Sequence, residues 1–198
     1  SLSSTTVPEN VLRAVIGQAS VTDPDASDSH VLRALGDDAE LLAIHGLEIA
    51  LAEGVSLDFE AKDILQFDLE AEDSGGLSVR NSFTVLVEDA FEGRIVDAPI
   101  SGALVCVDLN GNQLCDADEP PVESDAQGRY SLPKVDGGER LSAAGGQDVV
   151  TGEAFDEFTL SVRLTGEAPA AISITPISTI LANSEDPSAV LVSLGFPE

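Results

Sequence analysis

The chain has 198 residues, of which 43% are hydrophobic, so it can bury the core of one large domain or of two ordinary ones. Its net charge is −27, from 36 acidic against 9 basic residues; no basic patch can neutralise phosphates, which excludes nucleic acid and disfavours anionic membrane surfaces as partners. No run approaches the roughly eighteen apolar residues of a membrane span, so direct membrane insertion is not expected.

Residues 5–90 alternate apolar and polar side chains, and turn residues interrupt the alternation. His45–Gly46 is the expected turn of one hairpin, and residues 74–76 are the expected turn of another. About seven short strands at regular spacing predict an antiparallel sandwich. The expected strands are residues 11–16, 19–22, 30–35, 41–44, 47–51, 65–71 and 82–88.

Residues 91–170 repeat this style and predict a second, smaller sandwich. The expected strands are residues 93–96, 103–107, 129–132, 148–150 and 158–164, with a turn at 125–128. From residue 172 the apolar period changes, and Thr175–Pro176 and Asp186–Pro187 look like the starts of two short helices.

The predicted fold is therefore all-β: two Ig-like, Greek-key β-sandwich domains in tandem, followed by a short helical C-terminal segment. The expected boundaries are residues 1–90, 91–170 and 171–198. The chain begins at Ser1, with neither a Met nor a signal segment, so we expect it to be a fragment of a longer protein.

The most informative motif is the stretch from Asp108 to Glu119, which has the spacing of a twelve-residue calcium loop. Gln113 occupies position 6, where the pattern has glycine for a sharp turn. The apolar run that precedes the loop is expected to be a strand, so the flanking helices of an EF-hand are not implied. The alternative is a solvated Asp/Asn turn. Oxygen ligands for Ca²⁺ are expected at positions 1, 3, 5, 7 (a backbone carbonyl), 9 and 12: Asp108, Asn110, Asn112, Leu114, Asp116 and Glu119.

The two cysteines of the chain, Cys106 and Cys115, bracket the start of this loop. No third cysteine or nearby histidine pair offers a zinc or catalytic arrangement. A disulfide closing the loop is expected in an oxidising compartment, and two free thiols on strand faces are the alternative.

Five short acidic segments follow one another in the first half, and in this order they resemble the motifs of the cadherin repeat, in its bacterial cadherin-like variety. Cadherin repeats are Greek-key sandwiches that bind calcium at the joints between successive repeats. The segments are residues 7–10 (VPEN), 23–25 (DPD), 57–60 (LDFE), 71–75 (AEDSG) and 87–90 (VEDA).

The resemblance implies two sets of calcium ligands. Those matching ligands toward the following domain are Glu9, Asp58, Glu60 and Asp89, and those matching ligands toward a preceding domain are Asp23, Asp25 and Asp73. After Asp89 the chain has residues 90–93 (AFEG) in place of the family's Asn-Asp linker, which implies a single ion with help from Glu92. Solvated turn acids are the alternative, and acids spread as an adaptation to a salty medium are a further one.

The second half is similar to the transthyretin-like or Cna-B-like (prealbumin-type) sandwiches of bacterial surface proteins. The residues that carry the resemblance are 102–108 (GALVCVD), the loop 108–119 and residues 125–130 (DAQGRY). The resemblance implies that the loop binds calcium and that the domain serves as a spacer or stalk. Lys62 and Lys134 do not lie in matching strands, so an isopeptide bond is not implied.

Catalysis is not expected, because His30 and His45 have no matched nucleophile and the paired acids lie in calcium-type motifs. The predicted function is a calcium-rigidified extracellular module of a bacterial adhesin, part of a membrane-associated cell-surface protein, in cell adhesion or as a stalk. Expected partners are neighbouring repeats and another cell-surface protein or polysaccharide. The alternatives are a calcium-dependent carbohydrate-binding module and an accessory domain of a secreted polysaccharide-active protein.

Overall fold

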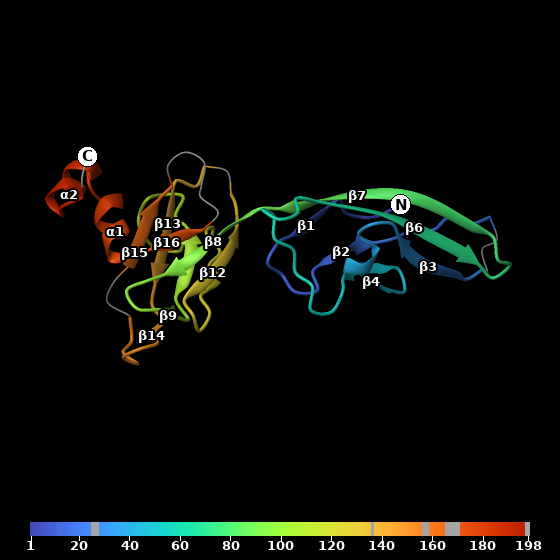
Figure 1. The fold of residues 1–198 in the computed structure, drawn as a ribbon, viewed down its shortest axis with the longest axis horizontal. Helices are drawn as coiled ribbons and strands as arrows, with labels where there is room; N and C mark the ends of the chain where they lie inside the picture. The colour runs from blue at the N-terminus through green and yellow to red at the C-terminus, as the bar shows by residue number, and fades with distance from the viewer. Residues whose placement is uncertain (25–27, 136, 156–158, 165–170, 197–198) are drawn as a thin grey trace. The chain divides into compact units, whose positions relative to one another are not determined.

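A computed structural model describes residues 1–24, 28–135, 137–155, 159–164 and 171–196 of the chain (Figure 1). The fold is all-β, with two short helices near the C-terminus, which confirms the predicted fold class. The chain divides into two compact units, Ser1–Asp89 and Ala90–Glu198. No described helix has both the length and the apolar character needed to cross a membrane.

The first unit is a sandwich of two sheets, with strand orders β1-β7-β6-β3 and β2-β5-β4. Its core draws on both sheets, with Leu65 and Val85 from one and Ile16 and Ile49 from the other, all 2% exposed or less. The elements are β1 (Thr6–Pro8), β2 (Val15–Gln18), β3 (His30–Leu35), the 3-10 helix η1 (Ala39–Leu41), β4 (Leu42–His45), β5 (Glu48–Leu51), β6 (Ile64–Asp73) and β7 (Ser78–Glu88).

The long hairpin of β6 and β7 forms because apolar and polar residues alternate from Leu65 to Ala71 in β6, and each apolar side chain in this stretch is buried. Phe67 stacks against Phe83 across the pair, with ring centroids 6.0 Å apart. Strand β1 runs parallel to β7 and brings Pro8 opposite Glu88. This pairing fixes the position of Glu9, which directly follows β1.

Two strand predictions in the first unit are wrong. The strand expected over residues 11–16 begins only at Val15, because Arg13 adopts a φ of 56° and breaks the extended chain. Residues 19–22 form no strand beyond a single bridge between Leu2 and Ala19. The hairpin of β4 and β5 is confirmed with its loop one residue later than expected, at Gly46–Leu47.

The second unit also packs two sheets around one core, with strand orders β11-β10-β13-β15 and β12-β8-β16, and it carries the additional pair β14-β9. Val105 and Leu141 of the first sheet meet Ile95 and Ile174 of the second. The strands are β8 (Ala90–Ile95), β9 (Ile100–Ser101), β10 (Leu104–Val107), β11 (Val122–Glu123), β12 (Arg129–Pro133), β13 (Arg140–Ala144), β14 (Gln147–Asp148), β15 (Thr159–Arg163) and β16 (Ile172–Ile174).

Several elements of this unit differ from expectation, among them the short strands β9 and β11, which were not predicted. Strand β13 was not predicted, although Leu141 and Ala143 are buried in it. Residues 149–150, expected to continue a strand, form a turn after β14. Strand β16 lies in the segment expected to be helical, because Ile172 and Ile174 point into the core on either side of the exposed Ser173. Residue 158, the expected start of β15, lies outside the described residues.

A row of three residues crosses the second sheet at Gly93. Tyr130 of β12 pairs with Gly93 of β8, which in turn pairs with Ile172 of β16. The Tyr130 hydroxyl reaches across the glycine and donates a hydrogen bond to the carbonyl oxygen of Ile172 at 2.7 Å. Burial raises the pKa of Tyr130 well above its ordinary value, so the hydroxyl remains a donor.

The helices α1 (Pro176–Ala182) and α2 (Pro187–Ser193) begin where their sequence signals predict. The Thr175 side chain accepts a hydrogen bond from the Ser178 amide at 2.9 Å, and the Ser178 hydroxyl accepts one from the Thr175 amide at 2.8 Å. At the other end of α1, the carbonyl oxygen of Ala182 accepts hydrogen bonds from Arg140 and Arg163. These arginines fix the end of α1 to the sheet.

Candidate cation sites

The loop Asp108–Glu119 wraps its backbone around a buried carboxylate. Asp108 follows β10 directly and is only 3% exposed. Its Oδ1 accepts a hydrogen bond from the Gly111 amide at 2.6 Å, and its Oδ2 accepts one from the Gln113 amide at 3.0 Å. These bonds orient Asp108, and the second lone pair of its Oδ1 can ligate a cation.

The last acid closes the loop from the other end. Glu119 is 2% exposed, and its two oxygens accept hydrogen bonds from the Leu109 amide at 2.7 Å and the Asp116 amide at 3.2 Å. A single carboxylate therefore joins loop positions 2 and 9. This contact gives the loop a closed form in which its first and last ligand positions are both buried.

The exposed half of the loop is organised by its two asparagines. Asn110 Oδ1 accepts from the Asn112 amide at 2.9 Å, and Asn112 Oδ1 accepts from the Leu114 amide at 2.7 Å. Asp116 Oδ2 accepts hydrogen bonds from the Nδ2 atoms of both asparagines, each at 2.8 Å. The two amide groups thus hold Asp116 beside loop positions 3 and 5.

The predicted disulfide between Cys106 and Cys115 is confirmed, with an S–S distance of 2.09 Å and a Cα–Cα distance of 5.7 Å. Cys106 lies in β10 and is buried, whereas Cys115 occupies loop position 8 and is half-buried. The bond therefore ties the middle of the loop to the sheet.

Gln113 adopts a φ of 65°, the left-handed conformation that the missing glycine would supply. We expect Gln113→Gly to raise the free energy of unfolding by about 0.5–1 kcal/mol, because the relief of left-handed strain exceeds the added entropy of the unfolded chain. Urea denaturation measures this difference. Leu109→Gly is the control in the same loop, where no positive φ is relieved, and it should lower stability. A destabilised Gln113→Gly variant would contradict the strain argument.

A basic residue outside the predicted ligand set lies beside the loop. Arg140 of β13 has its Nε 4.0 Å from Asp108 Oδ2, and it also donates to Asn183 Oδ1 at 3.0 Å. The hydroxyl of Ser142 donates to the same Asp108 oxygen at 3.3 Å. Strand β13 thus supplies two polar side chains next to Asp108, and it was not predicted because its Ser and Ala residues have little preference for a strand.

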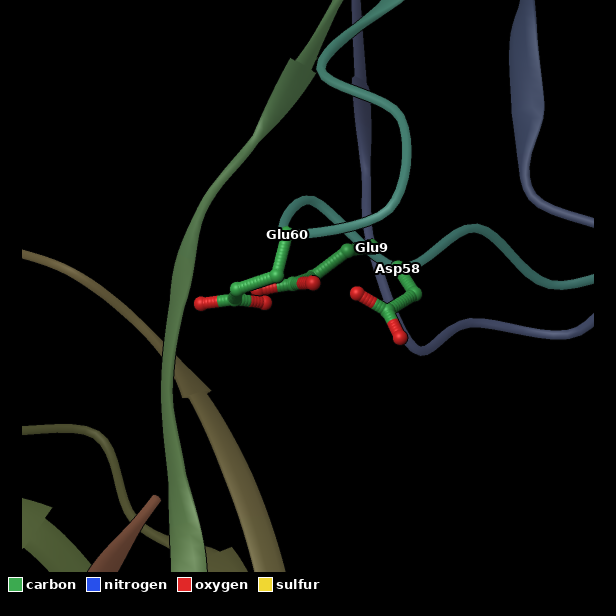
Figure 2. A group of neighbouring side chains, drawn as sticks. All are labelled: Glu9, Asp58 and Glu60. Carbon is green, nitrogen blue, oxygen red and sulfur yellow. The ribbon is translucent and has the colours of Figure 1, made fainter. Parts of the chain in front are cut away.

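In the first unit, the carboxylates of Glu9, Asp58 and Glu60 converge, with one oxygen of each within 4.8 Å of the others. Figure 2 shows the three side chains projecting from their loops into the same space. Glu9 is 3% exposed and accepts a hydrogen bond from the Phe59 amide at 2.7 Å, whereas Asp58 and Glu60 are exposed. Three like charges at this separation repel one another, and a divalent cation would remove that repulsion.

A second group in the same unit consists of Asp23, Asp28 and Asp73, again with oxygens within 4.8 Å of one another. Asp28 was not predicted, and Asp25, which was, lies outside the described residues. Hydrogen bonds from the Ser74 hydroxyl and then from the Ser29 amide lower the pKa of Asp28. Asp23 Oδ2 lies 3.0 Å from Nε2 of His30, a neighbour that the motif pattern does not include.

The remaining predicted ligands are placed differently. Asp89 directly follows β7 and is half-buried, but it is not one of the three carboxylates that converge around Glu9 in the described part of the chain. Glu92 lies in β8 opposite Ser131. Within the described residues, groups of three such acids occur only in the first unit, so the acids of the Asp108–Glu119 loop are farther apart than those around Glu9.

No protein-family model matches the sequence, and no curated protein matches it. Among solved structures, the EC1-2 fragment of human protocadherin-24 is 15% identical with a TM-score of 0.39, over 83% of this chain and 96% of that one. The human desmocollin-1 ectodomain is 14% identical with a TM-score of 0.36, over 88% of this chain and 41% of that one. Zebrafish RET cadherin-like domains 1 to 4 are 11% identical with a TM-score of 0.38, over 88% and 47%. Likeness at this level does not assign the chain to a family, and its all-β architecture rests on its own sheets.

Proposed function

We propose that this chain is a calcium-binding module of a bacterial extracellular adhesin, and that calcium makes its acidic loops rigid. The observation that carries the proposal is the Asp108–Glu119 loop, whose first and last ligand positions are buried carboxylates oriented by backbone amides. Ionised carboxylates are rarely left buried unless they have a counter-charge or a metal. Arg140, with its Nε 4.0 Å from Asp108, supplies one positive charge for the two carboxylates, and a hard divalent cation held by the loop's oxygens would supply the rest.

The donor set favours calcium over other metals. The expected ligands of the loop are carboxylate, amide and backbone oxygens, and both cysteines are committed to the disulfide. Calcium accepts six to eight oxygens at flexible angles, whereas magnesium requires a near-ideal octahedron and zinc prefers nitrogen and sulfur. A loop with expected oxygen ligands at six positions along one short segment suits calcium.

The Glu9, Asp58 and Glu60 group supports a second cation site. Glu9 is held by the backbone of residue 59, so its carboxylate is fixed while the two exposed acids can move toward a cation. A bound cation would link the segment after β1 to the loop at residues 58–60 and restrict both. The cost of holding three carboxylates together is then offset by the ion.

The partners that fit this role are neighbouring repeats of a longer surface protein and a further cell-surface protein. A sugar-binding role is less well supported, because Tyr130, the one tyrosine of the chain, is 4% exposed and cannot offer its ring to a sugar. The role is therefore adhesion or the spacing of adhesive modules from a cell surface.

Calcium titration by calorimetry tests the site around Glu9. We expect the D58N/E60Q variant to bind one calcium ion fewer than the unaltered chain, because two of three carboxylates lose their charge. E53Q, which removes one charge from an exposed position of the same unit, is the control and should leave the stoichiometry unchanged. Extracellular calcium modules bind with dissociation constants of about 0.1–1 mM, so a protein concentration of about 1 mM is needed to define the stoichiometry. Equal stoichiometry in D58N/E60Q and the unaltered chain would refute this site.

A further inference from the structure

We infer that the Cys106–Cys115 disulfide sets the calcium affinity of the Asp108–Glu119 loop and makes that affinity respond to thiol reductants. The inference rests on the proposed function, and it adds a regulation of the same loop by redox state.

The disulfide encloses most of the ligand positions in one covalent ring. It joins residues separated by 9 positions, and the ring contains loop positions 1, 3, 5 and 7. Cys106 is fixed in the sheet, where it is fully buried and pairs with Ser142 of β13. The ring is therefore anchored at one end, and its other end at Cys115 cannot move away from β10.

Without the bond, the exposed half of the loop would depend on its hydrogen bonds. Asn110 and Asn112 are exposed, and their hydrogen bonds to Asp116 compete with water. Gln113 would be free to leave its unfavourable positive φ. Calcium binding would then have to order this segment, and the entropy lost in doing so would reduce the net free energy of binding. The observed calcium affinity would therefore fall.

The chemistry requires a dithiol reductant, which attacks from solvent. A thiolate of the dithiol attacks Sγ of the half-buried Cys115 and forms a mixed disulfide, and Cys106 leaves as a thiolate that takes up a proton. The second thiol of the reductant then attacks the mixed disulfide and releases Cys115. The reductant leaves as a cyclic disulfide, and the protein holds two thiols.

Linkage makes the effect reciprocal. If the intact disulfide raises calcium affinity by a given factor, then bound calcium favours the disulfide over the dithiol by the same factor. A tenfold coupling corresponds to about 30 mV in the reduction potential of this two-electron couple. Two independent measurements can therefore test one quantity.

The first measurement is calcium affinity by calorimetry, made on the full chain in the D58N/E60Q background so that binding at the Glu9 group does not mask the loop. We expect about tenfold weaker calcium binding in dithiothreitol than in its absence, in line with the entropy of opening a short ring. The matched control is C106A/C115A, whose affinity should equal that of the reduced protein and should not respond to dithiothreitol. If this variant does not fold, the calcium affinity of the reduced chain and the second measurement, described next, still test the inference.

The second measurement is the fraction of disulfide in a defined dithiothreitol buffer, read by thiol alkylation and mass spectrometry. We expect calcium to lower the reduced fraction, and to have no such effect in D108N, which lacks the first ligand charge. Calcium binding of equal affinity in oxidised and reduced protein overturns the redox inference and leaves the proposed function standing. An oxidised D58N/E60Q chain whose loop binds no calcium overturns both.

Discussion

Addition of calcium is expected to raise the melting temperature of the second unit by about 10 °C relative to a chelator. At a calcium concentration about a hundredfold above the dissociation constant, one site that binds only the folded state adds about 2.7 kcal/mol of stability. In a unit of roughly a hundred residues, this free energy corresponds to a shift of about 10 °C. Differential scanning calorimetry in about 10 mM calcium and in chelator measures the shift, given a dissociation constant near 0.1 mM.

Two variants of the same loop make this experiment specific. D108N removes the buried first ligand charge and should abolish most of the calcium-dependent shift of the second unit. D118N makes the same charge change at loop position 11, which is exposed and is not a ligand position, so it should keep the full shift. Magnesium at the same concentration should have a smaller effect, because it sheds its bound waters reluctantly. A shift of equal size in D108N would show that calcium acts elsewhere.

Gly93→Ala is expected to lower the free energy of unfolding by about 3 kcal/mol or more. A Cβ atom at residue 93 would lie 1.8 Å from the carbonyl oxygen of Ile172, which is backbone and cannot rotate away. Strand β16 would have to leave β8, and the Tyr130 hydroxyl would lose the acceptor that it reaches across the glycine. Chemical denaturation followed by circular dichroism measures the loss.

Arg94→Ala is the matched control for this prediction. Arg94 is the next residue of β8, pairs with Ser173 of β16, and is exposed, so its truncation should change stability by no more than about 0.5 kcal/mol. If Gly93→Ala is as stable as Arg94→Ala, the close approach of β16 to β8 at this residue is not needed for the fold.

Local sequence signals predicted the parts of the structure that local interactions determine. The helix starts at Thr175–Pro176 and Asp186–Pro187 follow from capping chemistry within one turn. Strand β6 follows from its own alternation, and the hairpin of β4 and β5 follows from a glycine with a φ of 67° at residue 46. The disulfide could be expected because Cys106 and Cys115 are the two cysteines of the chain and lie close in sequence.

The parts that the sequence did not predict depend on distant partners. Strand β13 is made of small residues with little intrinsic preference for a strand, and it forms because β10 and β15 pair with it on either side. Strand β16 is only three residues long and is held by β8, almost eighty positions earlier in the chain. For the same reason, Arg140 could not be identified as a neighbour of Asp108. Asp28 lies close to Asp23 and Asp73 because the folded backbone brings these three residues together, and a short sequence motif does not record that proximity.

The two parallel strand pairs determine how each unit would respond to a tensile force. In each unit the first strand runs parallel to the last one: β1 beside β7, and β8 beside β16. A tensile force applied at the two ends of such a unit pulls these neighbouring strands in opposite directions along their length. Their hydrogen bonds are then loaded in shear and must break together, whereas strands peeled apart from one end release theirs singly. Both units therefore place their strongest resistance to stretching at the points where the chain enters and leaves the sandwich.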